Sequence, residues 1–175
     1  MRASHLLLAA LLVACRGGGN AGAGAPTADP GANPGPSDPC VVRHVADGDT
    51  LTCADGRRVR LIGIDSPERS QGAAFTAARA ALLRLAPVGG TVRLERDVSA
   101  TDRYGRALAW VWSGDRLVNE LLVEQGWAVL YTVPPDVRYL DRITAAQRRA
   151  RAASAGLWAA NGFDCLPRDR RRGAC

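Results

Sequence analysis

The sequence contains no lysine, and all 23 of its basic side chains are arginines. Arginine holds a phosphate through two parallel hydrogen bonds and keeps its charge near neutral pH. With 17 acidic residues the formal net charge is +6, so a polyanion is a suitable partner. A genome biased toward arginine would produce the same composition, and charge alone does not decide between these interpretations.

Histidine is almost absent, since His5 and His44 are the only two. A Ser-His-Asp or Cys-His catalytic system needs a histidine, and His44 lies inside an expected strand, where we interpret it as a structural or surface residue. No CxxC spacing occurs, which argues against a zinc site, and no phosphate-binding P-loop is present. The side chains that remain for catalysis are carboxylates and arginines.

The chain also lacks an apolar run long enough for a permanent membrane helix. Arg2 and the apolar residues 6–13 instead predict an export signal over residues 1–14. Residues 12–15 (LVAC) resemble the lipobox of bacterial lipoproteins, in which the cysteine, here Cys15, is lipidated; an ordinary cleaved signal is the alternative. Residues 15–39, rich in Gly, Ala and Pro, then form a flexible tether. We expect an exported protein that is lipid-anchored to a membrane of the bacterial cell envelope, or secreted if the lipobox is not used.

Four cysteines remain in the expected mature domain and tail: Cys40, Cys53, Cys165 and Cys175. An even number in an exported protein suggests disulfides, and four cysteines allow three pairings. Cys40 and Cys53 flank a hairpin turn almost symmetrically and could face each other across it. That pairing would leave Cys165 with Cys175.

Apolar periodicity and turn signals divide the rest of the chain into short elements. The expected strands are residues 40–45, 50–53, 58–64, 91–98 and 106–112, and the expected helices are residues 71–85, 118–125 and 137–155. Five strands with a helix after the third predict an α+β, mainly β-barrel domain over residues 40–166: a five-stranded OB-fold barrel with about three helices. Such barrels often bind nucleic acids and oligosaccharides. The basic tail, residues 167–175, is expected to be loosely held and could touch phosphates or lipid head groups without serving catalysis.

Four acidic residues surround the three-stranded meander at residues 40–64. Asp47 and Asp49 lie at its first turn, and Asp65 and Glu68 follow its third strand. A meander returns its third strand to the end where the first turn lies, so the four carboxylates should gather at one edge. Crowded carboxylates raise one another's pKa unless a cation shares the site.

Arginines should share this acidic edge. Arg60 lies five residues before Asp65, and strict alternation puts the two on opposite faces. Both can serve one site if the strand bulges or twists between them, and Gly63 is the natural position. Carboxylate oxygens suit calcium or magnesium, and arginines stabilise charge on phosphate oxygens. These are the parts needed for metal-assisted phosphodiester hydrolysis.

Five motifs occur in order along the chain. They are residues 47–50 (DGDT), 60–68 (RLIGIDSPE), 102–106 (DRYGR), 117–120 (LVNE) with 125–126 (QG), and 156–158 (GLW). Together, over about residues 41–160, they closely resemble the thermonuclease (staphylococcal-nuclease-like) family. The resemblance implies a calcium-dependent nuclease on an OB barrel that cuts DNA and RNA, as endonuclease and exonuclease, and leaves 3′-phosphate ends. We expect it to act as a monomer.

The resemblance also implies a metal site. Asp49 and Asp65 match the calcium-binding carboxylates of the family, and the carbonyl of Ser66 matches its backbone ligand. Asp47 matches an acid beside the metal that is not a direct ligand. Ser66 stands where the family often has threonine, and a backbone ligand tolerates that change.

The catalytic and substrate-binding roles follow in the same way. Glu68 matches the carboxylate that acts on the attacking water, as a general base or by orienting it. Arg60 and Arg106 match the two arginines that hold the scissile phosphate and its transition state. Arg103, often lysine in the family, and Tyr104 match positions that contact the terminal nucleotide phosphate and base.

The nucleotide-stacking tyrosines of the family are displaced in this sequence. Only Tyr131 is available in the corresponding region, in a shifted register. Tyr139 or Trp127 could substitute, although a core role suits Trp127 better.

Two other kinds of protein could carry such a barrel. One is a catalytically inactive OB-fold lipoprotein that binds nucleic acid, which has no reason to combine Asp49, Asp65, Glu68, Arg60 and Arg106. The other is a structural envelope lipoprotein, which would not need an arginine pair near an acidic cluster.

Overall fold

The computed structural model describes residues 38–159 and 161–175. These belong to the second of two units of the chain, residues 34–175. The expected signal peptide, the expected lipidation site at Cys15 and residues 16–37 of the expected tether lie outside the described residues.

The predicted strands and helices occur in the predicted order with ends shifted by a few residues, except that the expected strand over residues 58–64 is divided in two. Short strands, 3-10 turns and a C-terminal helix that were not predicted also occur. The strands are β1 (Asp38–Val45), β2 (Thr50–Cys53), β3 (Arg58–Leu61), β4 (Ile64–Asp65), β5 (Thr91–Glu95), β6 (Ala107–Ser113), β7 (Arg116–Leu117) and β8 (Val129–Leu130). The helices are α1 (Ala73–Leu85), α2 (Val118–Glu124), α3 (Leu140–Ala152) and α4 (Pro167–Arg171), with 3-10 turns η1 (Arg69–Gln71) and η2 (Gly156–Trp158). None of the described helices combines the length and apolarity needed to cross a membrane.

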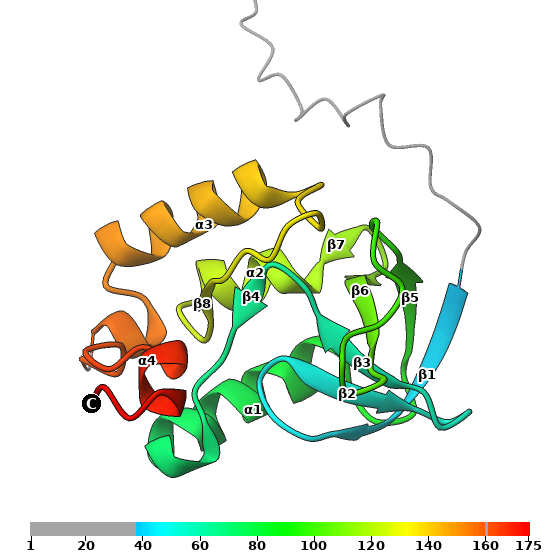
Figure 1. The fold of residues 1–175 in the computed structure, drawn as a ribbon, viewed down its shortest axis with the longest axis horizontal. Coiled ribbons are helices and arrows are strands. Elements are labelled where there is room, and N and C mark those ends of the chain that lie inside the picture. The colour runs from blue at the N-terminus through cyan, green and yellow to red at the C-terminus, as the bar shows by residue number, and fades with distance from the viewer. Residues whose placement is uncertain (1–37, 160) are drawn as a thin grey trace, which may run out of the picture. The chain divides into compact units, whose positions relative to one another are not determined.

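Five of the strands close into a barrel (Figure 1). Antiparallel pairs join β3 to β2, β2 to β1, β1 to β5 and β5 to β6. The parallel pair of β3 with β6, in which Arg60 faces Leu108, closes the circle. β1 pairs with β5 over residues 38–41 and with β2 over residues 42–45, where its register shifts between Val42 and His44. His44 is exposed. The α+β, five-stranded OB-type barrel is therefore confirmed.

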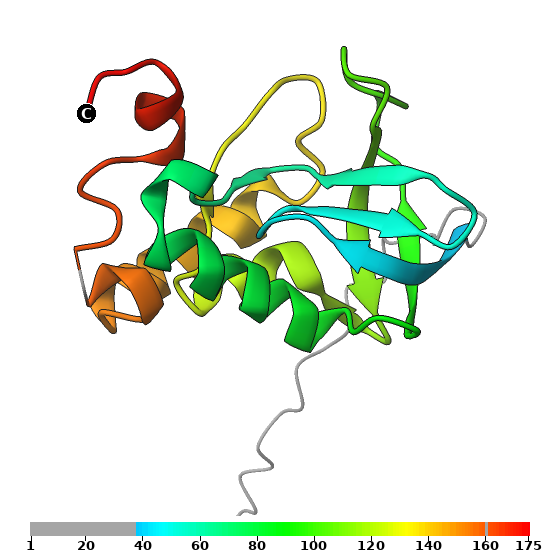
Figure 2. The same cartoon turned by 90° about the horizontal axis from the view of Figure 1, so that it is seen from below.

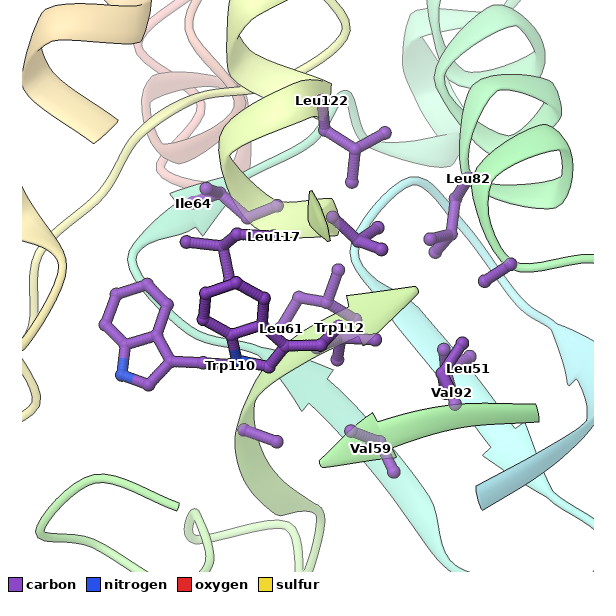
Figure 3. Close-up of a cluster of buried hydrophobic side chains, with 14 of the residues drawn as sticks. Leu51, Val59, Leu61, Ile64, Leu82, Val92, Trp110, Trp112, Leu117 and Leu122 are labelled. Carbon is purple, nitrogen blue, oxygen red and sulfur yellow. The ribbon is translucent and has the colours of Figure 1, made fainter. Parts of the chain in front are cut away.

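The barrel interior is filled by apolar side chains from every wall (Figure 3). Trp110 of β6 is fully buried, and Leu82 of α1 and Leu122 of α2 close the core from outside the sheet. Burying each large apolar side chain contributes roughly 1.5–3 kcal/mol. The helices therefore hold a rigid barrel, on whose rim the site is built.

Asn119 of α2 is the one fully buried polar side chain that ties a helix to the barrel among the described residues. Its Oδ1 accepts a hydrogen bond from the Val111 N–H at 2.9 Å. Its Nδ2 donates to the Ile62 carbonyl at 2.8 Å. The LVNE motif thus has a structural role, because it fixes α2 against β6 and the end of β3.

The chain changes direction at Gly63, between β3 and β4. Gly63 has a φ of +77°, and a Cβ there would lie 2.6 Å from the Trp110 ring. A side chain is therefore disfavoured by the backbone conformation and also excluded by the lack of space. Beyond it, β4 leaves the barrel and pairs with β8. The expected twist at Gly63 is confirmed, and it turns Asp65 toward Arg60.

Two further glycines, Gly126 and Gly156, bring the ends of α2 and α3 together. The Leu157 N–H donates to the Gly126 carbonyl at 3.0 Å. A Cβ on Gly126 would lie 2.0 Å from the Ala155 carbonyl oxygen, and one on Gly156 would lie 2.4 Å from that of Gln125. The two backbones are therefore in direct contact.

Within the described residues there are two disulfides, Cys40–Cys53 between β1 and β2 and Cys165–Cys175 at the C-terminus. The pairing in which the first crosses the hairpin is confirmed. The expectation of a loosely held tail is wrong, because residues 167–171 form α4 and the disulfide closes the segment around it. Figures 1 and 2 both show this segment beside the start of α1.

Candidate active site

A cavity of about 650 Å³ opens where the β1–β2 turn, the β3–β4 corner and the loop before β6 meet. Every residue expected at the site from the sequence lines it: Asp47, Asp49, Arg60, Asp65, Ser66, Glu68, Arg103, Tyr104 and Arg106. The four carboxylates of the meander therefore share one cavity with the expected arginines.

Arg60 sits between the two innermost carboxylates. Its guanidinium lies 3.0 Å from Asp49 Oδ1 and 3.4 Å from Asp65 Oδ1. It also donates to the carbonyls of Leu61 at 2.7 Å and Ile64 at 2.9 Å. These carbonyls belong to the corner around Gly63, so the turn that aims Asp65 also fixes Arg60.

Asp49 forms the floor of the cavity and is 6% exposed. Its Oδ2 accepts a hydrogen bond from the Ser66 N–H at 2.7 Å, and its Oδ1 accepts one from the Thr50 hydroxyl at 3.2 Å. Asp47 in turn accepts the Asp49 N–H at 3.0 Å. The first turn and the residues after β4 are thus joined through one carboxylate.

The acids of this cluster are perturbed by burial and by one another. Burial raises the pKa of Asp47 to about 6, and the charge of Asp49 adds to this effect. Burial also raises the pKa of Asp65, again with a contribution from Asp49, although Arg171 and Arg60 oppose it. Burial and mutual repulsion thus outweigh the attraction of the nearby arginines for both carboxylates.

Arg106 is held at the opposite wall by Asp102. Its Nε and Nη2 both lie 2.7 Å from Asp102 Oδ2, and its Nη1 donates to the Thr50 hydroxyl at 3.3 Å. Burial of Asp102 raises its pKa, but hydrogen bonds from the backbone and side chain of Arg106 outweigh this and leave that pKa below its usual range. From the sequence, Asp102 was expected only to form a turn. In the structure it also orients Arg106.

Tyr104 stands at the mouth of the cavity and is 58% exposed. The guanidinium of Arg103 lies 4.8 Å from the Tyr104 ring centre, and that of Arg106 lies 5.4 Å from it. Arg103 also donates to the Tyr104 hydroxyl at 2.7 Å. An open ring flanked by cations suits a nucleotide phosphate and base.

Of the three aromatics considered for base stacking, only Tyr131 lines the cavity. Tyr139 packs edge-on against Trp110 and Trp112, at 5.2 and 5.6 Å between ring centres, and its hydroxyl bonds Glu95. Trp127 packs against the apolar core. The structure therefore places Tyr139 and Trp127 in the scaffold.

One residue at the cavity was not expected there. Arg171, from α4, donates to Asp65 Oδ1 and Oδ2 at 3.0 and 2.8 Å and to Glu68 Oε1 at 2.5 Å. In the sequence it lies in an arginine run that is equally typical of a solvated tail. The pairing of Cys165 with Cys175 was the available signal, because it closes the chain around this run.

The oxygen atoms at the cavity floor fit a calcium ion by chemistry. Asp49 and Asp65 are both buried carboxylates beside Ser66, and hard oxygen donors of this kind bind calcium. As the side chains stand, no group of three or more His, Cys, Asp or Glu among the described residues could hold a metal ion. A set of two carboxylates and a backbone carbonyl would need water to complete it.

Comparison with known proteins agrees with this arrangement. Residues 58–160 match the family described as staphylococcal nuclease homologue. A thermonuclease of Staphylococcus intermedius is 36% identical over 125 residues, which cover 67% of this chain and 74% of that protein. An uncharacterized endonuclease of Haemophilus influenzae is 39% identical over 127 residues, covering 70% and 67%. The chain therefore belongs to the staphylococcal nuclease homologue family.

Proposed function

We propose that this protein is a calcium-dependent nuclease that hydrolyses phosphodiester bonds of DNA and RNA and leaves 3′-phosphate ends. The observation that carries the proposal is the single cavity that holds Arg60, Arg106 and Glu68 together with Asp49 and Asp65. The relatives named thermonuclease support the reaction class.

Asp49, Asp65 and the Ser66 carbonyl would hold the calcium ion. When bound, calcium supplies positive charge that neutralises a phosphate and the buried acids. The raised pKa values of Asp47 and Asp65 support this assignment, since a bound divalent cation would favour their ionised forms.

Arg60 and Arg106 would bind the scissile phosphate from two walls of the cavity. Each is paired with carboxylates that fix its orientation, so little side-chain freedom is lost when the phosphate arrives. Guanidinium groups placed in this way stabilise the charge that develops on the phosphate oxygens. Removing either should cost on the order of a few kcal/mol of transition-state stabilisation.

Glu68 would act on the attacking water. Its side chain is 35% exposed, so water has access to it. It either accepts the proton of the water or orients the molecule by a hydrogen bond.

The test is digestion of single-stranded DNA by the purified full-length chain, with calcium and with a chelator. Glu68→Gln and Arg106→Ala, prepared in parallel, exclude a contaminating nuclease. We expect cleavage that needs calcium, leaves 3′-phosphate ends and is lost in both variants. A folded protein that binds DNA without cutting it would instead be the inactive OB-fold binding protein.

A further inference from the structure

The residue that contacts the candidate metal site most closely comes from outside the family match. Arg171 donates hydrogen bonds to both carboxylate oxygens of Asp65, at 3.0 and 2.8 Å, and to one oxygen of Glu68. The match to the family ends at residue 160. Arg171 thus lies beyond the part of the chain that matches the family.

Several contacts fix the segment that carries Arg171. The Gln71 side chain of η1 donates to the Cys165 carbonyl at 2.9 Å. Arg170 donates to the Cys175 carbonyl at 2.7 Å and to the Ser70 hydroxyl at 3.2 Å. With the Cys165–Cys175 disulfide, these contacts hold α4 against η1, where Figures 1 and 2 show it.

A guanidinium that donates to both oxygens of a carboxylate competes with a metal ion for them, because the two cations repel each other and share the same lone pairs. Asp65 is 1% exposed, and its two oxygens are already bonded to Arg171, with Arg60 at 3.4 Å from one of them. A cation that binds Asp65 must therefore either displace Arg171 or share these oxygens with it against the repulsion of its charge. Because binding linkage is reciprocal, Arg171 must weaken the affinity for that cation.

We propose that Arg171 is an internal counter-ion of the active site, which competes with the metal ion for Asp65 and which the Cys165–Cys175 disulfide holds in place. The proposal rests on the proposed function, because it takes Asp65 as a metal ligand. It gives Arg171, and the Cys165–Cys175 disulfide that restrains it, a role in setting the calcium concentration that the enzyme requires.

The test measures CaCl₂ binding to the oxidised full-length chain by isothermal titration calorimetry, without nucleic acid. Arg171→Gln should bind calcium roughly fivefold or more tightly than the wild type, within the range usual for coupled sites. Arg172→Gln is the matched control, because it removes the same charge one residue away, and it should match the wild type. Arg171→Lys, with one donor group in place of two, should lie between wild type and Arg171→Gln.

The disulfide is tested with a Cys165→Ala/Cys175→Ala variant. Freeing the segment should raise the calcium affinity of the wild type but add nothing to Arg171→Gln. Near-ultraviolet circular dichroism checks that each variant is folded.

Three results would overturn the proposal. Equal or weaker calcium binding by Arg171→Gln would show that Arg171 does not compete. An equal increase in Arg172→Gln would show a general effect of charge. If wild type and all variants fail to bind calcium, the metal-dependent function is overturned together with this proposal, and the chelator arm of the digestion assay would then show no effect.

Discussion

Asp47 shows how a single carboxylate can make stability depend on pH. Its pKa of about 6 in the folded protein lies above its ordinary value of 3.8. The folded state therefore binds the proton more tightly than the unfolded state does. Stability must fall as pH rises from about 4 to 6, and the full penalty remains above pH 6.

Asp47→Asn should remove this penalty. We expect its free energy of unfolding at pH 7.5, in a chelator, to exceed that of the wild type by about 1–2 kcal/mol, with little difference at pH 4. The asparagine oxygen can still accept the Asp49 N–H. Urea unfolding between pH 4 and 7.5 measures the difference, and parallel pH profiles for the two proteins would contradict the assignment.

Asn119 provides a residue-scale prediction about the core. Asn119→Leu would leave the buried Val111 N–H and Ile62 carbonyl without the partners they now have. The free energy of unfolding should fall by about 3 kcal/mol, from two unsatisfied groups at about 1–3 kcal/mol each. Chemical denaturation checks this, with the nearby half-buried Glu124→Gln as a control expected to change stability far less.

At this scale the sequence motifs located the cavity residues correctly, and they missed the partners that orient them. The turns and strand ends around Asp49, Asp65 and Arg106 are local signals. Asp102 orients Arg106 from only four residues away in the same turn, whereas Arg171 acts through a contact that only tertiary structure brings close. Arg171 lies 106 residues from Asp65 along the chain, and no periodic pattern spans that distance.

At the scale of elements, the ends of strands and helices depended on hydrogen bonds that no local pattern shows. The expected strand 91–98 ends at Glu95. Beyond it, the N–H groups of Val98 and Ser99 donate to the side chain of Asp136, at 3.0 and 2.8 Å, and not to a neighbouring strand. The expected helix 137–155 begins at Leu140 instead. Just before it, the Arg138 N–H donates to Asp97 at 2.9 Å.

Glu95 joins β5 to the start of α3. It is buried, and it accepts hydrogen bonds from Arg138, Tyr139 and the Trp112 indole at 2.7–2.9 Å. Burial of Glu95 raises its pKa, but these hydrogen bonds outweigh burial and leave the pKa below its ordinary value. The ionised form is thus favoured by folding, so its contribution is present at neutral pH and is lost as pH falls through the folded-state pKa.

Glu95→Gln should therefore destabilise the protein at pH 7 by about 1–2 kcal/mol, since one partner, Arg138, is partly exposed. The gap to wild type should narrow at acid pH, as the pH falls through the lowered pKa and the wild-type carboxyl is also protonated. Thermal unfolding across this range measures it. A constant difference at all pH values would mean that shape, and not charge, is what Glu95 contributes.

For the whole molecule, a net charge of +6 carried by arginines predicts nucleic-acid binding that weakens with salt. Glu68→Gln should bind DNA without turnover, which allows affinity to be measured. If Arg60, Arg103 and Arg106 each engage one phosphate of a single strand, the slope of log affinity against log salt is about −2. Arg103→Gln should reduce the slope by about 0.7, and an unchanged slope would remove Arg103 from the phosphate contacts.

The overall architecture could be predicted because its motifs appear in a fixed order and its strands are short and regular. The C-terminal segment could not, because composition alone does not separate a solvated basic tail from one folded onto an acidic cavity. The two differ by the contacts of Gln71, Arg170 and Arg171. The contacts with η1 and Asp65 join residues that are 94 to 106 positions apart along the chain, so no local pattern shows them.

The contact between Gly126 and Gly156 has a consequence for how this sequence can evolve. The atoms that a side chain would meet at either position belong to the backbone, so no change of a neighbouring side chain can make room. A substitution at one glycine therefore has no single compensating mutation, and descendants of this chain can vary there only by shifting the end of α2 relative to that of α3. The two positions should tolerate mutation less than most of the buried apolar core, where volume lost at one residue can be recovered at another.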